Sequence, residues 1–156
     1  MQNYIKSQTR LAFVQYIFQN EFLDADFLEG IEDFQKHFYD TNIAIIDEKK
    51  EFKLKFNKNF LNKLCSSFKN NIDKKNIIED LNGFIDINRK FEKWDNILKS
   101  IIFAIIAELL ITEKNKLKIV FNDYLNISKS LVSQKETKLI NAIIQKYIDK
   151  NEIIKK

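Results

Sequence analysis

Apolar residues recur along most of the chain with the period of an α-helix. Spacings of three and four positions place side chains on one face, which is typical of a helix that buries one side. Six amphipathic helices are predicted in this way, approximately over residues 11–22, 27–38, 60–68, 77–85, 117–132 and 139–148. Ser133 and Glu136 have the spacing of a capping box, so the last helix is expected to begin beside them.

The segment 91–111 has a different pattern, because apolar residues cover nearly its whole circumference. Isoleucine, leucine and phenylalanine fill most positions from Ile97 to Leu110. A helix that is apolar on all sides belongs in the middle of a bundle. With this seventh segment, the chain is predicted to be all-α, a compact bundle of about seven helices.

Between the second and third predicted helices, one short stretch alternates with the period of a strand. Residues 52–56 read Phe-Lys-Leu-Lys-Phe, which suits a strand paired onto residues 43–46 across the polar segment 47–50. An irregular or helical connection is the interpretation favoured here, and the strand pair is the alternative.

Composition supports a single helical domain spanning residues 1–156. The chain has no proline and only two glycines, so the strongest breakers of helices are nearly absent. Its 45% hydrophobic content is high enough for a buried core. Cys65 has no partner for an internal disulfide, and no apolar run reaches the roughly 20 residues that a membrane helix needs. We therefore expect a cytoplasmic protein with no membrane partner.

The net charge of +4 is concentrated near the C-terminal end. Residues 113–156 carry ten lysines and five acidic residues, whereas residues 1–112 carry 16 basic and 17 acidic residues. A basic face attracts phosphate groups. However, 24 of the 26 basic residues are lysines in a chain rich in Ile and Asn, a bias that an AT-rich genome also produces.

Residues suited to catalysis or metal binding are sparse. His37 and Cys65 are the only histidine and cysteine, and their positions favour a surface side chain and a core side chain, respectively. The acidic residues between Glu21 and Asp33 lack the glycine of an EF-hand loop, so a solvated face is favoured over a cation site. We expect no enzymatic activity, no metal and no cofactor.

Four short motifs in the last third of the chain occur together in a fixed register. They are Glu108-Leu109, Phe121-Asn122-Asp123, Lys129 and Leu139-Ile140-Asn141-Ala142. This series resembles the NusB family of bacterial transcription antitermination factors, whose pattern runs Tyr-Glu-Leu, Ile-Asn-Glu, Ala-Lys and Phe-Val-Asn-Gly at the same intervals. The first predicted helix is similar to that of the family at Arg10, Val14, Gln15, Ile17 and Phe18.

The resemblance implies an all-helical fold of two small packed subdomains and a non-enzymatic role. Members of the family bind boxA-type single-stranded RNA and ribosomal protein NusE within the RNA polymerase antitermination complex, which promotes read-through in ribosomal RNA synthesis. It also implies that Asn122 serves mainly in hydrogen bonding between helices.

The RNA-binding residues implied by the resemblance begin in the N-terminal segment, which is rich in arginine in the family. Here that segment offers only Lys6 and Arg10, with Ser7 and Gln8 between them. We expect Lys135 and Lys138 to add to them, and Lys114, Lys116 and Lys118 are further candidates. Tyr4 and Phe18 are candidates for stacking on bases, although a core position is favoured for Phe18. The expected partner-binding residues are Arg89, Glu92 and Lys93.

Two other functions remain open from the sequence. The reduced N-terminal basic segment suits a protein-interaction module with the NusB fold and weakened or lost RNA binding. The RNA-binding portion of a ribosomal RNA methyltransferase is a weaker alternative, because no methyl-donor-binding domain is present in the sequence.

Overall fold

The computed structural model describes residues 1–20, 26–38, 41–45, 48–85 and 90–151. Within these parts the chain forms seven α-helices, two short 3-10 helices and one pair of strands. The α-helices are α1 (Asn3–Asn20), α2 (Ile31–Phe38), α3 (Lys58–Asn71), α4 (Lys74–Phe84), α5 (Asn96–Leu109), α6 (Leu117–Ser128) and α7 (Gln134–Asn151). The prediction of a helical bundle is confirmed.

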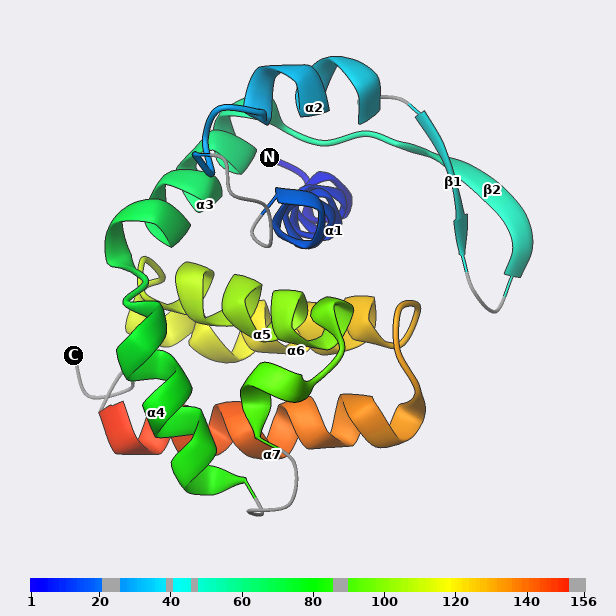
Figure 1. Cartoon of the computed structure of the whole chain (residues 1–156). Coiled ribbons are helices and arrows are strands. Elements are labelled where there is room, and N and C mark those ends of the chain that lie inside the picture. Colours follow the sequence, from blue (N-terminus) through cyan, green and yellow to red (C-terminus); the bar gives the residue numbers. More distant parts are fainter. Residues whose placement is uncertain (21–25, 39–40, 46–47, 86–89, 152–156) are drawn as a thin grey trace.

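The helices lie in two groups that share one hydrophobic core (Figure 1). The first group contains α1, α2 and α3, and the second contains α4, α5, α6 and α7. Helix α1 is seen nearly end-on, while α5, α6 and α7 run across the view, so α1 crosses them steeply. This arrangement places the N-terminal helix against α5 and α6.

Helix α5 is the central helix, as its continuous apolar pattern predicts. Every residue from Ser100 to Leu109 is buried, including the two small alanines Ala104 and Ala107. The ring of Phe103 meets Phe68 of α3 and Phe91 edge-on, at centroid distances of 6.0 and 5.6 Å. Burial of such aromatic side chains makes α5 the main source of hydrophobic stabilisation shared by both groups.

Helix α1 buries a wider face than the apolar stripe in its sequence predicts. Phe13, Val14, Tyr16 and Ile17 are all fully buried, because α1 packs against both α3 and α5. Phe18 lies at the edge of this face and is 42% exposed. The expectation that Phe18 belongs to the core is therefore wrong.

The connection between α2 and α3 is a strand pair, so the irregular or helical connection favoured from the sequence is wrong. β1 (Thr41–Ile45) pairs antiparallel with β2 (Glu48–Leu54), and Ile43 lies opposite Phe52. The register is irregular between Ala44 and Ile45. Pairing with β1 gives the alternating segment at the end of β2 backbone hydrogen-bond partners without a helix, and the hairpin projects to one side of the bundle (Figure 1).

Polar side chains of α1 hold the chain where it leaves the hairpin. The backbone N–H of Lys55 donates to Oε1 of Gln8 at 3.0 Å, and that of Asn57 donates to Oγ1 of Thr9 at 2.9 Å. The Asn57 side chain then caps α3 by accepting from the backbone N–H of Phe60. The first two bonds satisfy the backbone N–H groups of Lys55 and Asn57, just before α3. The third satisfies one of the N–H groups in the first turn of α3, which have no partner within the helix.

No helix in the described parts of the chain is both long and apolar enough to cross a bilayer.

Candidate nucleic-acid interface

A buried ion network lies where α1 crosses α5 and α6. Arg10 is only 7% exposed and binds Glu108 of α5 through two nitrogens, with Nε 2.9 Å from Oε1 and Nη2 2.7 Å from Oε2. Its Nη1 atom binds Oδ2 of Asp123 in α6 at 2.6 Å. The hydroxyl of Tyr124 donates to Oε1 of Glu108 at 2.7 Å. One guanidinium therefore joins three helices.

Electrostatics in the network favour the charged arginine. Burial alone would lower the pKa of Arg10, but hydrogen bonds and charge from Glu108, together with the bond to Asp123, outweigh it and raise that pKa. Burial, followed by the charge of Glu108, raises the pKa of Tyr124 well above its ordinary value. Tyr124 thus stays neutral and donates a hydrogen bond to the Glu108 carboxylate. The buried charge of Arg10 is paired with the carboxylates of Glu108 and Asp123.

Ser7 extends the network to the surface at the N-terminal end of α1. Its Oγ atom donates to Oδ1 of Asp123 at 2.7 Å. Asp123 therefore accepts from Ser7 with one oxygen and from Arg10 with the other. These contacts hold the first turns of α1, which carry Tyr4 and Lys6, against α6.

Two residue roles expected from the sequence change in the light of this network. Arg10 was expected to contact RNA, but its guanidinium is buried and bound to two carboxylates, so it is a structural residue of the helix crossing. Asn122 was expected to bond between helices, but its side chain is exposed and the adjacent Asp123 makes that contact instead. A shift of one residue turns a helical side chain by 100°, which separates the two roles.

An open groove of about 370 Å³ lies between the exposed faces of α6 and α7. Its polar lining comes from three asparagines, two lysines and one threonine, namely Asn122, Asn126, Asn141, Lys129, Lys138 and Thr137. Lys129 Nζ lies 3.3 Å from Oδ1 of Asn126. The groove therefore offers exposed cations for phosphate groups and amide groups for the edges of unpaired bases.

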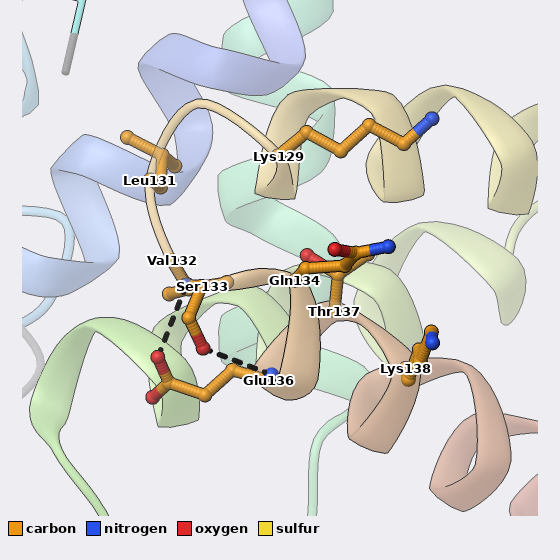
Figure 2. A pocket seen from close by; sticks show the side chains of 8 residues that line it. All are labelled: Lys129, Leu131, Val132, Ser133, Gln134, Glu136, Thr137 and Lys138. Atoms are coloured by element: carbon orange, nitrogen blue, oxygen red, sulfur yellow. Dashed lines mark hydrogen bonds between the residues drawn. The ribbon is translucent and has the colours of Figure 1, made fainter. Parts of the chain in front are cut away.

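The groove continues into a hollow of about 730 Å³ around the α6–α7 connection (Figure 2). The capping box predicted from the sequence is confirmed here. The backbone N–H of Ser133 donates to Oε1 of Glu136, and the backbone N–H of Glu136 donates to Oγ of Ser133, both at 3.1 Å. This reciprocal pair fixes the start of α7 and so positions Lys138 one turn later.

The structure brings some of the expected RNA-binding lysines together and leaves others apart. Lys138 lines the groove with Lys129, which the prediction of contact residues did not include. Lys135 is exposed near the start of the same helix, while Lys6 is half-buried at the beginning of α1. Tyr4, one of the two candidates for base stacking, is 58% exposed. The helical spacing of Asn122, Asn126 and Lys129 was a sequence signal for this surface.

The residues expected to bind a protein partner lie at the connection between α4 and α5. Glu92 and Lys93 are exposed in the 3-10 helix η1 (Phe91–Lys93), and Arg89 lies outside the described residues. Asn82 of α4 donates to Oε1 of Glu92 at 2.7 Å, and this hydrogen bond is the main cause that lowers the pKa of Glu92. The carboxylate is therefore fixed, charged and accessible.

Side chains expected to lack chemical roles lie where the sequence placed them. Cys65 is fully buried, which raises the pKa of its thiol, and His37 is exposed. Across the described residues, no group of three or more histidine, cysteine, aspartate or glutamate side chains has the geometry to hold a metal ion. Part of the acidic block between Glu21 and Asp33 lies outside those residues.

Comparison with known proteins agrees with this architecture. Residues 7–149 match the model of the NusB family, so the chain belongs to that family. It is 26% identical over 141 residues to the transcription antitermination protein NusB of Rickettsia conorii, covering 90% of this chain and 89% of that protein. It is 25% identical over 149 residues to the protein of the same name from Rickettsia felis, covering 96% and 94% of the two chains. No solved structure gives a significant match.

Proposed function

We propose that this protein is a cytoplasmic transcription antitermination factor that holds single-stranded boxA-type RNA together with ribosomal protein NusE. Its role in the RNA polymerase antitermination complex is to join these molecules without transforming them. Membership of the NusB family over residues 7–149 is the observation that carries the proposal. The names of its relatives from Rickettsia point to the same process.

The groove between α6 and α7 is the proposed RNA contact. Lys129 and Lys138 supply cations for phosphates, and Asn122, Asn126 and Asn141 supply amide donors and acceptors. Lys135 on α7 and Lys6 on α1 are further proposed contacts outside the groove lining. Tyr4 provides an exposed ring on which an unpaired base stacks. Arg10 has no place in the contact because its guanidinium holds the helices together.

The proposed NusE contact is the exposed connection before α5, where Glu92 and Lys93 present charges of both signs. Arg89 belongs to the same proposal from its position in the sequence. Neither Glu92 nor Lys93 lines the α6–α7 groove, so the two proposed contacts use different side chains.

Fluorescence anisotropy with a labelled boxA-like RNA, with and without NusE, tests the RNA contact. The variant Lys129→Glu/Lys138→Glu should weaken binding and flatten its salt dependence, since both lysines line the groove. Lys63→Glu/Lys75→Glu makes the same charge change at exposed positions of α3 and α4 and should bind as the natural protein does. If the natural protein binds no boxA-like RNA at low salt, either with or without NusE, the proposed RNA contact is wrong.

The burial of Arg10 favours a second candidate, a protein-interaction module that has lost RNA binding. With Arg10 enclosed, Lys6 is the one basic side chain in the first ten residues outside the ion network. In this case NusE should be recovered equally well by the natural protein and by Lys6→Glu, while boxA-like RNA binds neither. Arg10 is left intact in this experiment, because its replacement would disturb the helix crossing.

A further inference from the structure

A second open cleft, of about 980 Å³, lies on the other side of the first turns of α7. One wall is the exposed edge of α7, and the other is formed by the end of α4 and the beginning of α5. The apolar lining includes Ile85, Leu98, Leu139 and Ile143. Leu139 is 38% exposed and Ile85 is partly exposed, whereas Leu98 and Ile143 are buried, so Leu139 and Ile85 supply the apolar surface that a partner can reach.

The charged side chains on the α7 wall of the cleft are mainly positive. Lys135, Lys138 and Lys146 all line the cleft and are exposed. Of the two acidic residues in the lining, Glu136 is held by the backbone of Ser133 in the capping box. The other, Asp95, stands on the opposite wall at the start of α5. A partner that lies along α7 therefore meets mainly lysines.

The line of residues along α7 suits the close approach of another helix. Lys135, Leu139, Ala142 and Lys146 follow one helical stripe, which spans about 16 Å from first to last at 1.5 Å per residue. Ala142 stands in the middle of this stripe, is exposed, and has the smallest side chain in it. A small residue between longer ones leaves a recess into which a ridge of a second helix fits.

Aromatic side chains in the cleft are poorly placed for binding RNA bases. Trp94 is only 7% exposed, and its ring packs against Phe91 at a centroid distance of 5.4 Å. The ring of Phe84 is covered by Nζ of Lys150, 5.7 Å from its centroid. Since single-stranded nucleic acid binds on free aromatic faces, the aliphatic floor of the cleft favours a protein segment.

We propose that this cleft is a docking site for an acidic amphipathic helix of a partner protein. The apolar face of that helix lies on Ile85, Leu139 and Ala142, and its glutamate or aspartate side chains pair with Lys135, Lys138 and Lys146. This mode of recognition uses apolar anchors at helical spacing for affinity and charges at the rim for orientation. Lys138 lines both this cleft and the α6–α7 groove, so a docked helix competes with RNA for that lysine, but docking of the helix does not itself require RNA binding.

Trp94 provides a reporter for occupation of the cleft, because it is the only tryptophan in the chain. The probe is a tryptophan-free peptide of about 18 residues, long enough to be partly helical in water, with leucines along one face and glutamates on both flanks. A peptide of the same composition, scrambled so that the leucines lose helical spacing, is the first control. A version with lysines in place of glutamates is the second.

The expected result is a saturable change in Trp94 emission with the acidic amphipathic peptide and with neither control. Lys146→Glu should weaken the peptide about five-fold, as expected for a charge at the rim. Ala142→Gln should weaken it about ten-fold by filling the recess. Lys63→Glu on α3 makes the same charge change as Lys146→Glu away from the cleft and should have no effect. Circular dichroism and thermal unfolding of each variant should match the natural protein, because Ala142 and Lys146 are exposed.

Three outcomes overturn the proposal. They are no saturable change with the acidic peptide, equal binding of the scrambled peptide, and unchanged affinity in both Lys146→Glu and Ala142→Gln. A parallel titration with oligouridine separates the two classes of macromolecule. If oligouridine changes Trp94 emission and Lys146→Glu abolishes that change, the cleft binds nucleic acid and the assignment to a protein helix is wrong.

Discussion

Arg10 and Glu108, which are 98 residues apart in the sequence, meet in the structure with Nη2 of the arginine 2.7 Å from Oε2 of the glutamate. Their contact fixes how the N-terminal helix crosses the central helix. The same guanidinium reaches Asp123 on α6, beside the residues that line the proposed RNA groove. The network thus links the packing of the bundle to the position of its proposed functional surface.

Replacing Glu108 with glutamine should destabilise the fold, because it leaves the buried charge of Arg10 with a single anionic partner. Loss of one member of a buried ion pair costs roughly 3–5 kcal/mol, and about 3 kcal/mol is expected since Asp123 remains. For a chain of this size that corresponds to a fall in Tm of roughly 6–12 °C. Thermal unfolding monitored by circular dichroism measures the change.

The matched control for this variant is Glu79→Gln, which removes the same charge from an exposed position of α4. Its Tm should stay within about 2 °C of the natural protein, since an isolated surface charge contributes little. Equal stability of Glu108→Gln and Glu79→Gln would contradict the assigned role of the network.

Two adjacent residues of α6, Asn122 and Asp123, should respond differently when amide and carboxylate are exchanged. One substitution should lower stability, and the other should weaken RNA binding. Asp123→Asn weakens the bonds to both Ser7 and Arg10 and should cost about 1.5 kcal/mol of unfolding free energy. Asn122→Asp adds a negative charge to the groove, so it should leave stability unchanged and weaken RNA binding. Urea unfolding and RNA anisotropy on both variants make the comparison. A stability loss confined to Asn122→Asp would reverse these assignments.

Lys138→Gln should lower the steepness with which RNA affinity falls as salt rises. If Lys138 makes one phosphate contact, the slope of log affinity against log salt should decrease in magnitude by about 0.7, the contribution per contact for a single strand. Titrations at several salt concentrations measure this slope. Lys63→Gln serves as the control, and an unchanged slope in Lys138→Gln would remove that lysine from the contact.

Stability should decline above about pH 10 because buried tyrosines resist ionisation in the folded state. Burial, aided by the charge of Asp80, raises the pKa of Tyr147 from 10.0 to about 12. Its contribution is fully present below the unfolded pKa of about 10 and is lost as pH rises through the folded pKa, because the unfolded chain releases this proton first. Chemical unfolding from pH 8 to about 12 should show the fall, and Tyr147→Phe should reduce it. If the free energy of unfolding fell equally steeply with pH in the natural protein and in Tyr147→Phe, Tyr147 would not be the cause of the fall.

Periodicity anticipated most of the fold because helix formation in this chain is dominated by local spacing and by the burial of one face. The entirely apolar segment became the central α5, and Ser133 with Glu136 formed the expected cap of α7. The predictions failed at two places where contacts between separate segments determine the structure. The hairpin depends on pairing between the two segments β1 and β2, and Phe18 was left at the edge of a face widened by two neighbouring helices.

The sequence alone determined the helical class, the family register and the outward side of the helix that carries Asn122, Asn126 and Lys129, because each depends on residues a few positions apart or on intervals counted along the chain. Only the tertiary structure decided that Asp123, beside the outward-facing Asn122, makes the contact with α1, and that Arg10 serves the core rather than a ligand. Both outcomes depend on how α1 crosses α5 and α6. That crossing is set by side chains about a hundred residues apart, whose meeting no local pattern encodes.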